Sequence, residues 1–502
     1  MARQSRALTL SRRRLIRSLL ALLALALVAA LAGGVTLWQR LHAPVYQHTP
    51  NAINTGQSIL YLSSPGFAPA PTLLTMVRTS DGAMLWHDSL DGTLSSGFSP
   101  TLGEALAHGQ AVEVANGVVY FVVDPDHLGS PNREQELMAL RADDGTELWR
   151  QPVQGAFVEV FGVSDGVVCI RVTQQQGSEL VSSALSGYNA RTGSLAWQRQ
   201  GSDVTGSQNT SYSVILFDGI LYVTGAADSA LSFSSLRVTA LLASTGQTLW
   251  QYAEALPNAA SGAQFSVYPV AAENGIVVLL ATGLIGIRER DGTVPWRYQA
   301  SNIIYRVPHD GGNAPGILEQ GGALYFGTTA ADTSLQLNSL QVTTGHLLWR
   351  QPISAAKFVL WDLAVGGGSV YAILVPQWAG PHPSFDGLML SAVEMRSGTL
   401  RWQDRPAVQA LPYIAGTGAV VLLASTAGQT GLSATDGASL WHHALAFVRV
   451  IPAADGTAIL SSVVSTGADT WTGTLCGLQQ ATGTTRWCNQ FATGLAEVVL
   501  GP

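Results

Sequence analysis

Few residues of this chain have the types and spacing that metal binding or catalysis requires. The segment Asp124-Pro125-Asp126-His127 brings two carboxylates and an imidazole together, but a calcium loop needs more oxygen ligands at regular spacing. His442 and His443 are adjacent, and neighbouring residues of a strand point to opposite faces, so they do not chelate one ion together. The chain has no Gly-x-Ser-x-Gly elbow and no phosphate-binding loop. We therefore predict no catalytic residue, no resident cofactor and no metal site.

The cysteines offer one covalent possibility. Cys476 and Cys488 lie symmetrically about Thr482, which the repeat described below places at the tip of a hairpin. In that register the two side chains face each other at a separation that a disulfide can bridge. The alternative is a pair of free thiols on adjacent strands. Cys169 lies in an apolar run and is predicted to be a small buried hydrophobe.

Trp378 is a candidate for surface contact. It lies in a segment rich in proline and glycine, residues 375–383, whose composition does not suit a core strand. A tryptophan in such a loop either forms a contact hot spot for a partner or pins its own loop. Both interpretations stay open.

A repeated signature, Gly-x-x-x-Trp, determines how such residues are positioned. It occurs nine times with constant internal spacing and uses nine of the 13 tryptophans. A period near 50 residues is typical of arrays in which no unit can bury its apolar face alone. We expect these tryptophans to be structural packing residues rather than carbohydrate platforms. They are Trp86, Trp149, Trp197, Trp250, Trp296, Trp349, Trp402, Trp441 and Trp487.

Each repeat reads as four antiparallel strands. In the second unit, Asn116-Gly117 predicts a turn, residues 118–123 and 137–140 have strand composition, and Asp144-Gly145 predicts a tight turn before the return strand with Trp149. An apolar run before the first turn supplies the fourth strand. Four-stranded sheets repeated radially form a β-propeller. We predict an all-β chain with a single propeller; nine repeats favour nine blades, and eight remain the alternative.

The lengths of the repeats differ mainly between the second and third strands. Because consecutive strands alternate in direction, these insertions and the links between units share one face, which we call the insertion face, opposite the Gly turns. The insertions are residues 63–72, 124–136, 173–184, 226–235 and 375–387. The chain ends in an apolar segment, residues 497–500, without successors. We predict that this strand completes the first blade, near Thr55-Gly56, and closes a propeller spanning residues 55–502.

The motif [Asp/Ser/Thr]-Gly-x-x-x-Trp in a four-stranded unit resembles the repeat of the pyrroloquinoline-quinone (PQQ) type propeller family. That family includes quinoprotein alcohol dehydrogenases and the propeller lipoprotein of the outer-membrane assembly machine, and the resemblance covers roughly residues 55–502. It implies that the repeat tryptophans pack between neighbouring blades and that eight blades are usual.

Two departures from the family argue against redox catalysis. The family's repeat often carries Asp three residues before the Asp/Thr-Gly pair, and none of the nine units has it. Quinone dehydrogenases also resemble one another in an adjacent Cys-Cys pair under the cofactor, which is absent here, as is a Cys-x-x-Cys-His haem attachment. PQQ and calcium therefore belong only to the alternative hypothesis, a quinone-dependent dehydrogenase or a PQQ-binding sensor.

The first 40 residues differ in kind from the rest. Residues 1–17 form a basic head, and residues 18–39 are 22 uncharged residues, long enough to span a bilayer at about 1.5 Å per residue. The arginine excess predicts a cytoplasmic N-terminus and an extracytoplasmic propeller, joined by a linker at residues 40–54. Cleavage after Ala30-Leu31-Ala32 stays open, as does twin-arginine against general export for residues 11–17.

The charge of the remaining chain limits its partners. Seven of the 26 basic residues lie in residues 1–40 and all 33 acidic residues lie beyond, which leaves a net charge of −14 there. Such a surface disfavours nucleic acid and anionic lipid. We predict a membrane-anchored, non-enzymatic binding or scaffolding module of the cell envelope. Its partner would be a protein, peptide or glycan on the insertion face, and the sequence names neither the partner nor an oligomeric state.

Overall fold

The computed structural model describes residues within one compact unit, residues 47–502. The described ranges are 58–63, 72–90, 92–94, 112–125, 133–176, 179–201, 212–227, 235–255, 268–281, 283–299, 302–304, 306–309, 312–354, 358–377, 387–406, 413–425, 428–443, 449–453, 455–465, 471–491 and 497–500. The predicted basic head, membrane segment and linker lie outside these ranges. In the described part, no helix is long and apolar enough to cross a membrane.

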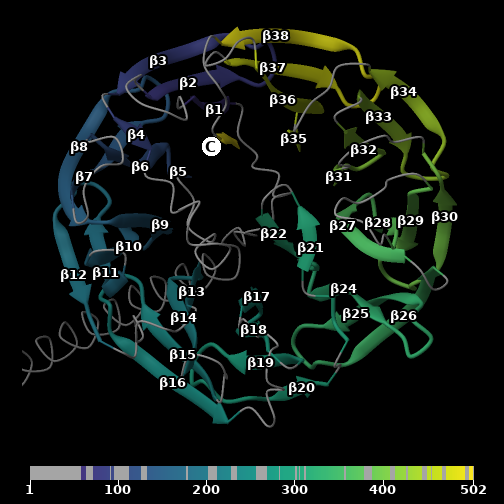
Figure 1. The fold of residues 1–502 in the computed structure, drawn as a ribbon, viewed down its shortest axis with the longest axis horizontal. Helices are drawn as coiled ribbons and strands as arrows, with labels where there is room; N and C mark the ends of the chain where they lie inside the picture. The colour runs from purple at the N-terminus through teal and green to yellow at the C-terminus, as the bar shows by residue number, and fades with distance from the viewer. Residues whose placement is uncertain are drawn as a thin grey trace, which may run out of the picture. The chain divides into compact units, whose positions relative to one another are not determined.

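The described residues form nine sheets of the predicted kind, which we number in chain order (Figure 1). Sheet 1 contains β1 (Ser58–Ser63), β2 (Thr72–Arg78), β3 (Met84–Leu90) and β39 (Glu497–Leu500). Sheet 2 contains β4 (Thr93–Leu94), β5 (Val112–Ala115), β6 (Val118–Asp124), β7 (Arg133–Arg141) and β8 (Glu147–Gly155). Sheet 3 contains β9 (Phe157–Ser164), β10 (Val167–Gln176), β11 (Glu179–Asn189) and β12 (Leu195–Arg199).

The remaining six sheets repeat this plan with four strands each. Sheet 4 contains β13 (Tyr212–Phe217), β14 (Ile220–Ala227), β15 (Ser235–Leu242) and β16 (Thr248–Ala255). Sheet 5 contains β17 (Tyr268–Glu273), β18 (Ile276–Leu280), β19 (Leu284–Arg288) and β20 (Trp296–Tyr298). Sheet 6 contains β23 (Ile317–Gln320), β24 (Ala323–Thr329), β25 (Leu335–Gln341) and β26 (Leu347–Ser354).

The last three sheets complete the series. Sheet 7 contains β27 (Phe358–Gly366), β28 (Ser369–Pro376), β29 (Met389–Glu394) and β30 (Leu400–Asp404). Sheet 8 contains β31 (Tyr413–Gly416), β32 (Val420–Ser425), β33 (Gly428–Ser433) and β34 (Ser439–His443). Sheet 9 contains β35 (Arg449–Pro452), β36 (Thr457–Ser465), β37 (Trp471–Gln479) and β38 (Thr485–Phe491).

The first sheet combines both ends of the described chain. Strand β39 pairs antiparallel with β1, so that Leu500 lies opposite Ile59. Thr55 and Gly56 lie outside the described residues. The sheet order β3-β2-β1-β39 gives sheet 1 four strands, as in sheets 3 to 9, although only three of them are consecutive in sequence. Pairing between the two ends ties the last strand to the first unit without a covalent bond.

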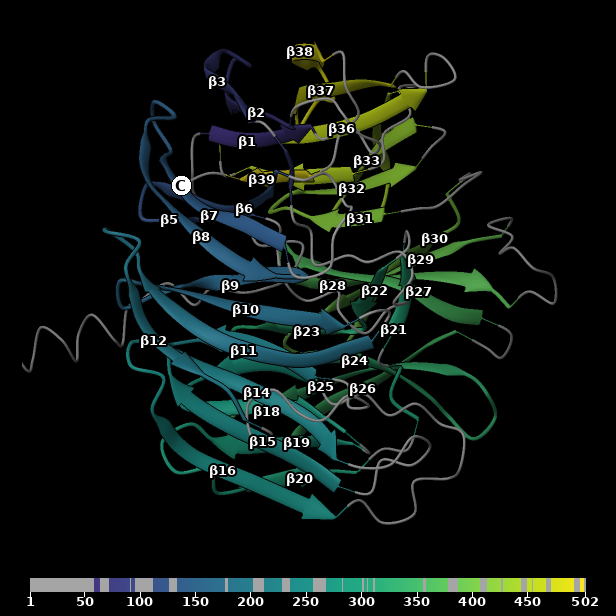
Figure 2. The ribbon, with the colours of Figure 1, turned by 60° about the vertical axis from the view of Figure 1, so that its left-hand side comes forward.

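The hydrophobic core lies between sheets rather than inside any one of them. A cluster around Trp149 combines side chains of β6 and β7 with side chains of β9 and β10, and a cluster around Trp349 does the same for sheets 6 and 7. Consecutive sheets can be followed one after another in Figures 1 and 2. Because each apolar face is covered by the next sheet, the array is stable only as a series.

Two features depart from the sequence-based prediction. Residues 173–184 are not an insertion: β10 runs to Gln176 and β11 begins at Glu179, and the ladder continues through Thr173 opposite Ser183. The polar composition hid this strand pair, in which the Thr173 and Ser183 hydroxyls also form a hydrogen bond across the strands at 3.1 Å. The second feature is a hairpin of β21 (Arg306–His309) and β22 (Gly312–Pro315) in the link between sheets 5 and 6, where no strand was predicted.

Candidate functional site

The nine repeat tryptophans join each sheet to the next. Every indole Nε1 donates a hydrogen bond to a backbone carbonyl of the following sheet, with donor–acceptor distances between 2.5 and 3.1 Å. Eight of these tryptophans are buried, and Trp441 is partly buried. The last of them, Trp487, donates to the Thr79 carbonyl at 2.7 Å, which joins sheet 9 to sheet 1. The series of sheets is therefore closed by the same contact that builds it.

The glycine of the repeat is required by this contact. Gly145 has a φ of +72°, and a Cβ built on it would lie 2.9 Å from the Trp86 ring of the preceding sheet. Gly398 has the same φ, and its Cβ would lie 2.6 Å from the Trp349 ring. A side chain at either position would be strained in backbone and would collide with an indole. Glycine and tryptophan of neighbouring repeats thus form one packing unit.

A further repeat signal lies ten residues before each tryptophan. The residue at this position pairs with the tryptophan across the strands, and in eight of nine units it is Gly, Ala or Ser; Met76 is the exception. A Cβ on Gly187 would lie 2.2 Å from the Trp197 indole nitrogen. The small residue leaves room for the ring, and its constant spacing is visible in the sequence, where we did not identify it.

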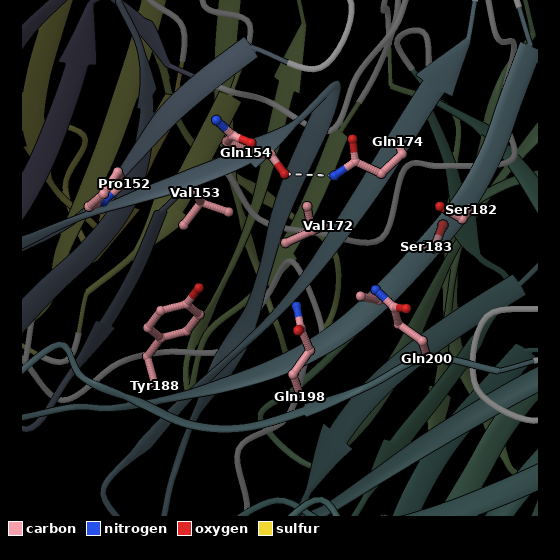
Figure 3. A pocket seen from close by; sticks show the side chains of 11 residues that line it. Pro152, Val153, Gln154, Val172, Gln174, Ser182, Ser183, Tyr188, Gln198 and Gln200 are labelled. Carbon is pink, nitrogen blue, oxygen red and sulfur yellow. Dashed lines mark hydrogen bonds between the residues drawn. The ribbon is translucent and has the colours of Figure 1, made fainter.

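A cavity of 210 Å³ opens between sheets 2 and 3, and we call it the slot. Its lining comes from β8 on one side and from the face of sheet 3 formed by β10, β11 and β12 on the other (Figure 3). The lining residues are Pro152, Val153, Gln154, Val172, Gln174, Ser182, Ser183, Ala184, Tyr188, Gln198 and Gln200. The extended ends of β10 and β11 supply Gln174 and the two serines, so the slot exists because residues 173–184 are strands.

The side chains of the slot converge from both sides. In Figure 3, Tyr188, Gln198 and Gln200 lie across the slot from Gln154 and Gln174, with Val172 between them. The Gln174 amide donates to the Gln154 carbonyl at 2.7 Å and so holds β8 to sheet 3. This hydrogen bond leaves one edge of the slot fixed and the opposite edge open.

One cross-strand pair of residues in each sheet differs between interfaces in whether its two side chains are bonded to each other. The residue that directly follows each repeat tryptophan pairs across the strands with the residue eleven positions before that tryptophan. The two paired residues are therefore twelve positions apart in sequence. This pair is bonded in five sheets: Thr75 with His87, Asn338 with Arg350, Ser391 with Gln403, Thr430 with His442, and Cys476 with Cys488.

In sheet 3 the same pair is Ser186 and Gln198, and it is not bonded. Within the described part of the chain the Ser186 hydroxyl, which is fully buried, has no hydrogen-bond partner. Alternation along β11 places Ser186 on the same face as Ala184 and Tyr188, which is the face that lines the slot. The Gln198 side chain is exposed and lines the slot instead of reaching Ser186.

The slot is electrically neutral. None of its 11 lining residues carries a charge at neutral pH. Burial raises the pKa of Tyr188, so its hydroxyl stays protonated and can donate. The nearest buried charges of sheet 3, Glu159 and Arg171, form an ion pair on the opposite face, where the guanidinium also lies 5.6 Å from the centre of the Phe161 ring. Burial raises the pKa of Glu159, although Arg171 opposes this shift.

The sequence-predicted site residues fall in different places. Cys476 and Cys488 are joined by a disulfide across β37 and β38, and Cys169 is buried as a free thiol. Trp378 lies outside the described residues, as do Asp126 and His127. None of the three cysteines lines the slot.

Among the described residues, no group of three or more His, Cys, Asp or Glu could hold a metal ion. Neither described disulfide cysteine is adjacent to another cysteine, and Cys169 is buried in an apolar interface. We therefore derive no reaction step through PQQ or calcium.

Comparison with known proteins agrees with the repeat. Residues 72–266 match the family model described as outer membrane protein assembly factor BamB, and this range contains the slot. No curated protein sequence matches the chain. Similar solved structures include BamB from Moraxella catarrhalis, with 12% identity, a TM-score of 0.38, and coverage of 87% of this chain and 92% of that one.

Two further similar structures are dehydrogenases. The quinohemoprotein alcohol dehydrogenase from Comamonas testosteroni has 14% identity, a TM-score of 0.39, and coverage of 89% of this chain and 78% of that one. A europium-containing methanol dehydrogenase has 11% identity, a TM-score of 0.42, and coverage of 84% and 83%. Identities and scores this low carry no argument about activity. The family match over residues 72–266 supports the resemblance of this repeat to the PQQ-type β-propeller family.

Proposed function

We propose that this chain is a non-enzymatic binding or scaffolding module of the cell envelope. The observation that carries the proposal is the slot: it uses the same interlocked frame as the other interfaces, yet it leaves Gln198 and Gln200 exposed around a cavity. Polar groups that converge on a preformed cavity are typical of binding sites. The family match over residues 72–266 supports a role among envelope proteins, since its description is that of an assembly factor.

The frame suits a docking role. Nine indole-to-carbonyl contacts fix the sheets relative to one another, and loops held by a rigid scaffold are the usual place for binding residues. Gln174 lies near the end of β10 and Ser182 near the start of β11, so the slot opens at the insertion face. A partner on this face would meet the slot and the neighbouring insertions together.

The proposal includes the location of the propeller. Residues 18–39 are uncharged and follow a head rich in arginine, a pattern that predicts a cytoplasmic N-terminus and an anchored, extracytoplasmic propeller. A disulfide between Cys476 and Cys488 suits an oxidising compartment.

Site-specific photo-crosslinking in cells tests the proposal. A benzophenone amino acid replaces Ser182, exposed at the insertion face, or Asp143, whose side chain is 78% exposed in a turn at the opposite ends of the strands. We expect a discrete adduct from position 182 and none from position 143. Equal labelling at both positions, or no adduct at either, would contradict the proposal.

Thermal unfolding separates this function from the dehydrogenase alternative. The full chain in detergent is heated with and without calcium and PQQ. A ligand at 100 times its dissociation constant stabilises the folded state by about 2.7 kcal/mol. We expect no saturable shift; a saturable one would replace the scaffold proposal with the quinone-dependent one.

A further inference from the structure

The lining of the slot selects for a neutral ligand that both donates and accepts hydrogen bonds. Gln154, Gln174, Gln198 and Gln200 each carry an amide with two donor hydrogens and an acceptor oxygen, and the Tyr188 hydroxyl does both. A charged ligand would find no opposite charge in the slot and would lose its hydration on entry. Sugar hydroxyls combine donor and acceptor in one group and match this set.

The rest of the lining suits the apolar faces of a sugar ring. Val153, Val172 and Ala184 form an apolar floor between the polar groups. The volume of 210 Å³ is smaller than the roughly 300–1,000 Å³ of pockets for drug-sized ligands. A space of this size accommodates one ring-sized unit of a longer chain, whose neighbouring units would continue along the open edge.

The structure disfavours an extended peptide in the same place. A peptide that adds to a sheet edge needs free backbone donors and acceptors. Two edge strands line the slot, β8 of sheet 2 and β12 of sheet 3, and Pro152 removes a donor from β8 just where it lines the slot. Strands β10 and β11 are paired on both sides and offer no edge.

We propose that the slot between sheets 2 and 3 binds one residue of an uncharged glycan, held by the Gln198 and Gln200 amides and by the Tyr188 hydroxyl. This inference rests on the proposed binding function and names the chemical class of its ligand. The buried Ser186 hydroxyl, opposite Gln198 on the same face, has no hydrogen-bond partner among the described residues, whereas the equivalent Ser391 accepts from Gln403.

A glycan array probed with the full chain in detergent tests the inference. The array carries neutral, acidic and sulfated oligosaccharides together with uncharged Ser/Gly peptides. Two variants address the slot: Gln198→Ala with Gln200→Ala removes two exposed amides, and Ser182→Trp fills the space from an exposed position. The matched control is Gln251→Ala, an exposed glutamine that also follows a repeat tryptophan but lies outside the slot.

We expect binding to neutral glycans only, weakened about tenfold or more in the double variant, abolished in Ser182→Trp, and unchanged in Gln251→Ala. Circular dichroism of the variants should match that of the unmodified chain. Binding to peptides or acidic glycans instead, no glycan binding, or neutral-glycan binding that survives both slot variants would overturn the inference. If glycan binding fails while position 182 still yields a protein adduct in cells, the binding function stands and only its ligand class is wrong.

Discussion

The interface between sheets 2 and 3 and the interface between sheets 6 and 7 use the same repeat positions to different ends. Each has a clamping tryptophan, Trp149 or Trp349, that donates to the next sheet at 2.8 Å. At the second interface Gln403 donates to the Ile353 carbonyl at 2.7 Å and to the Ser391 hydroxyl at 2.9 Å, which closes it. At the first, the equivalent Gln198 makes neither bond, and a cavity remains.

The comparison teaches that framework and recognition use separate positions of one repeat. The tryptophan and the glycine of the next turn fix the distance between sheets, whatever the neighbouring residues do. The position after the tryptophan then either closes the interface or leaves it open. An open interface costs little stability as long as its amide remains in contact with water, because a solvated amide is not an unsatisfied one.

The first strands of sheets 3 and 7, β9 and β27, each carry a buried acidic residue, and the two residues differ in where their bonding partners lie. In sheet 3, Glu159 has Arg171 as a partner within its own sheet. In sheet 7, Asp362 is fully enclosed and accepts from the backbone amides of Leu363 and Ile414 at 2.8 and 3.2 Å, the second of which lies in sheet 8. Polar side chains of sheet 7 therefore form hydrogen bonds with both neighbouring sheets, while the buried charges of sheet 3 pair with each other within that sheet.

The largest expected effect concerns the clamp that both interfaces share. Trp349→Ala and Trp149→Ala should each lower the free energy of unfolding by about 3–5 kcal/mol, because each removes a buried indole and leaves a cavity. Denaturant titration followed by circular dichroism measures the loss. The matched control is Leu348→Ala, next to the clamp but 51% exposed, which should change stability by less than about 0.5 kcal/mol. A small loss for Trp149 alone would mean that the open interface is not clamped.

The next largest expected effect on stability comes from removing the disulfide, which is the covalent form of the cross-strand pair. Replacing Cys476 and Cys488 together by Ser should cost about 2–4 kcal/mol, since the disulfide restricts the unfolded chain across 12 positions. Thermal unfolding with and without reductant measures it. The double variant serves as the control, since reductant should leave its midpoint unchanged. An unchanged midpoint for the reduced original chain would show that this pair adds no more than the hydrogen-bonded ones.

Much of this fold can be predicted from the sequence because its repeat is strict. The Gly-to-Trp spacing of four is the same in all nine units, and it locates the turn, the outer strand and the interface together. The structure explains the constancy: a ring and a glycine from neighbouring units meet face to face, and neither can move without the other. Sequence reasoning failed where no such constraint acts, as at residues 173–184, whose strands pair without a repeat glycine or tryptophan to mark them.

The candidate site could not be predicted in the same way. Gln198 and Gln403 look alike in the sequence, since each follows a repeat tryptophan and faces a serine. What separates them is whether β8 or β26 approaches closely enough for the amide to reach a carbonyl, and that depends on how two sheets pack. The sequence motif shows which glutamine and serine are paired, but it does not show the distance between the two sheets.

The contribution of Asp362 in sheet 7 to stability should depend on pH. Burial raises the pKa of Asp362 from 3.8 to about 7, so the folded chain holds this proton where the unfolded chain releases it. The contribution of Asp362 to stability is then fully present below about pH 4 and is lost as the pH rises towards 7, by up to about 1.4 kcal/mol per pH unit. Asp362→Asn should flatten the pH dependence of the unfolding midpoint between pH 4 and 7.

The control for this prediction is Asp143→Asn, a change to an exposed carboxylate at a turn, which should leave the pH dependence as it is. The same pH dependence in Asp362→Asn and in the unmodified chain would show that Asp362 does not carry the proton. That result would also remove the contrast between the first strands of sheets 3 and 7.

The most direct test of the difference between the two interfaces is the stability of two matched glutamine variants. Gln403→Ala should lower the free energy of unfolding by about 1–2 kcal/mol, because it removes two hydrogen bonds and leaves the partly buried Ile353 carbonyl without this donor. Gln198→Ala should change it by less than about 0.5 kcal/mol, because the exposed amide contributes no bond to the described fold. Urea titration of both variants beside the unmodified chain, without ligand, gives the comparison. Equal losses would mean that Gln198 closes its interface as Gln403 does, and that the slot is not held open for a ligand.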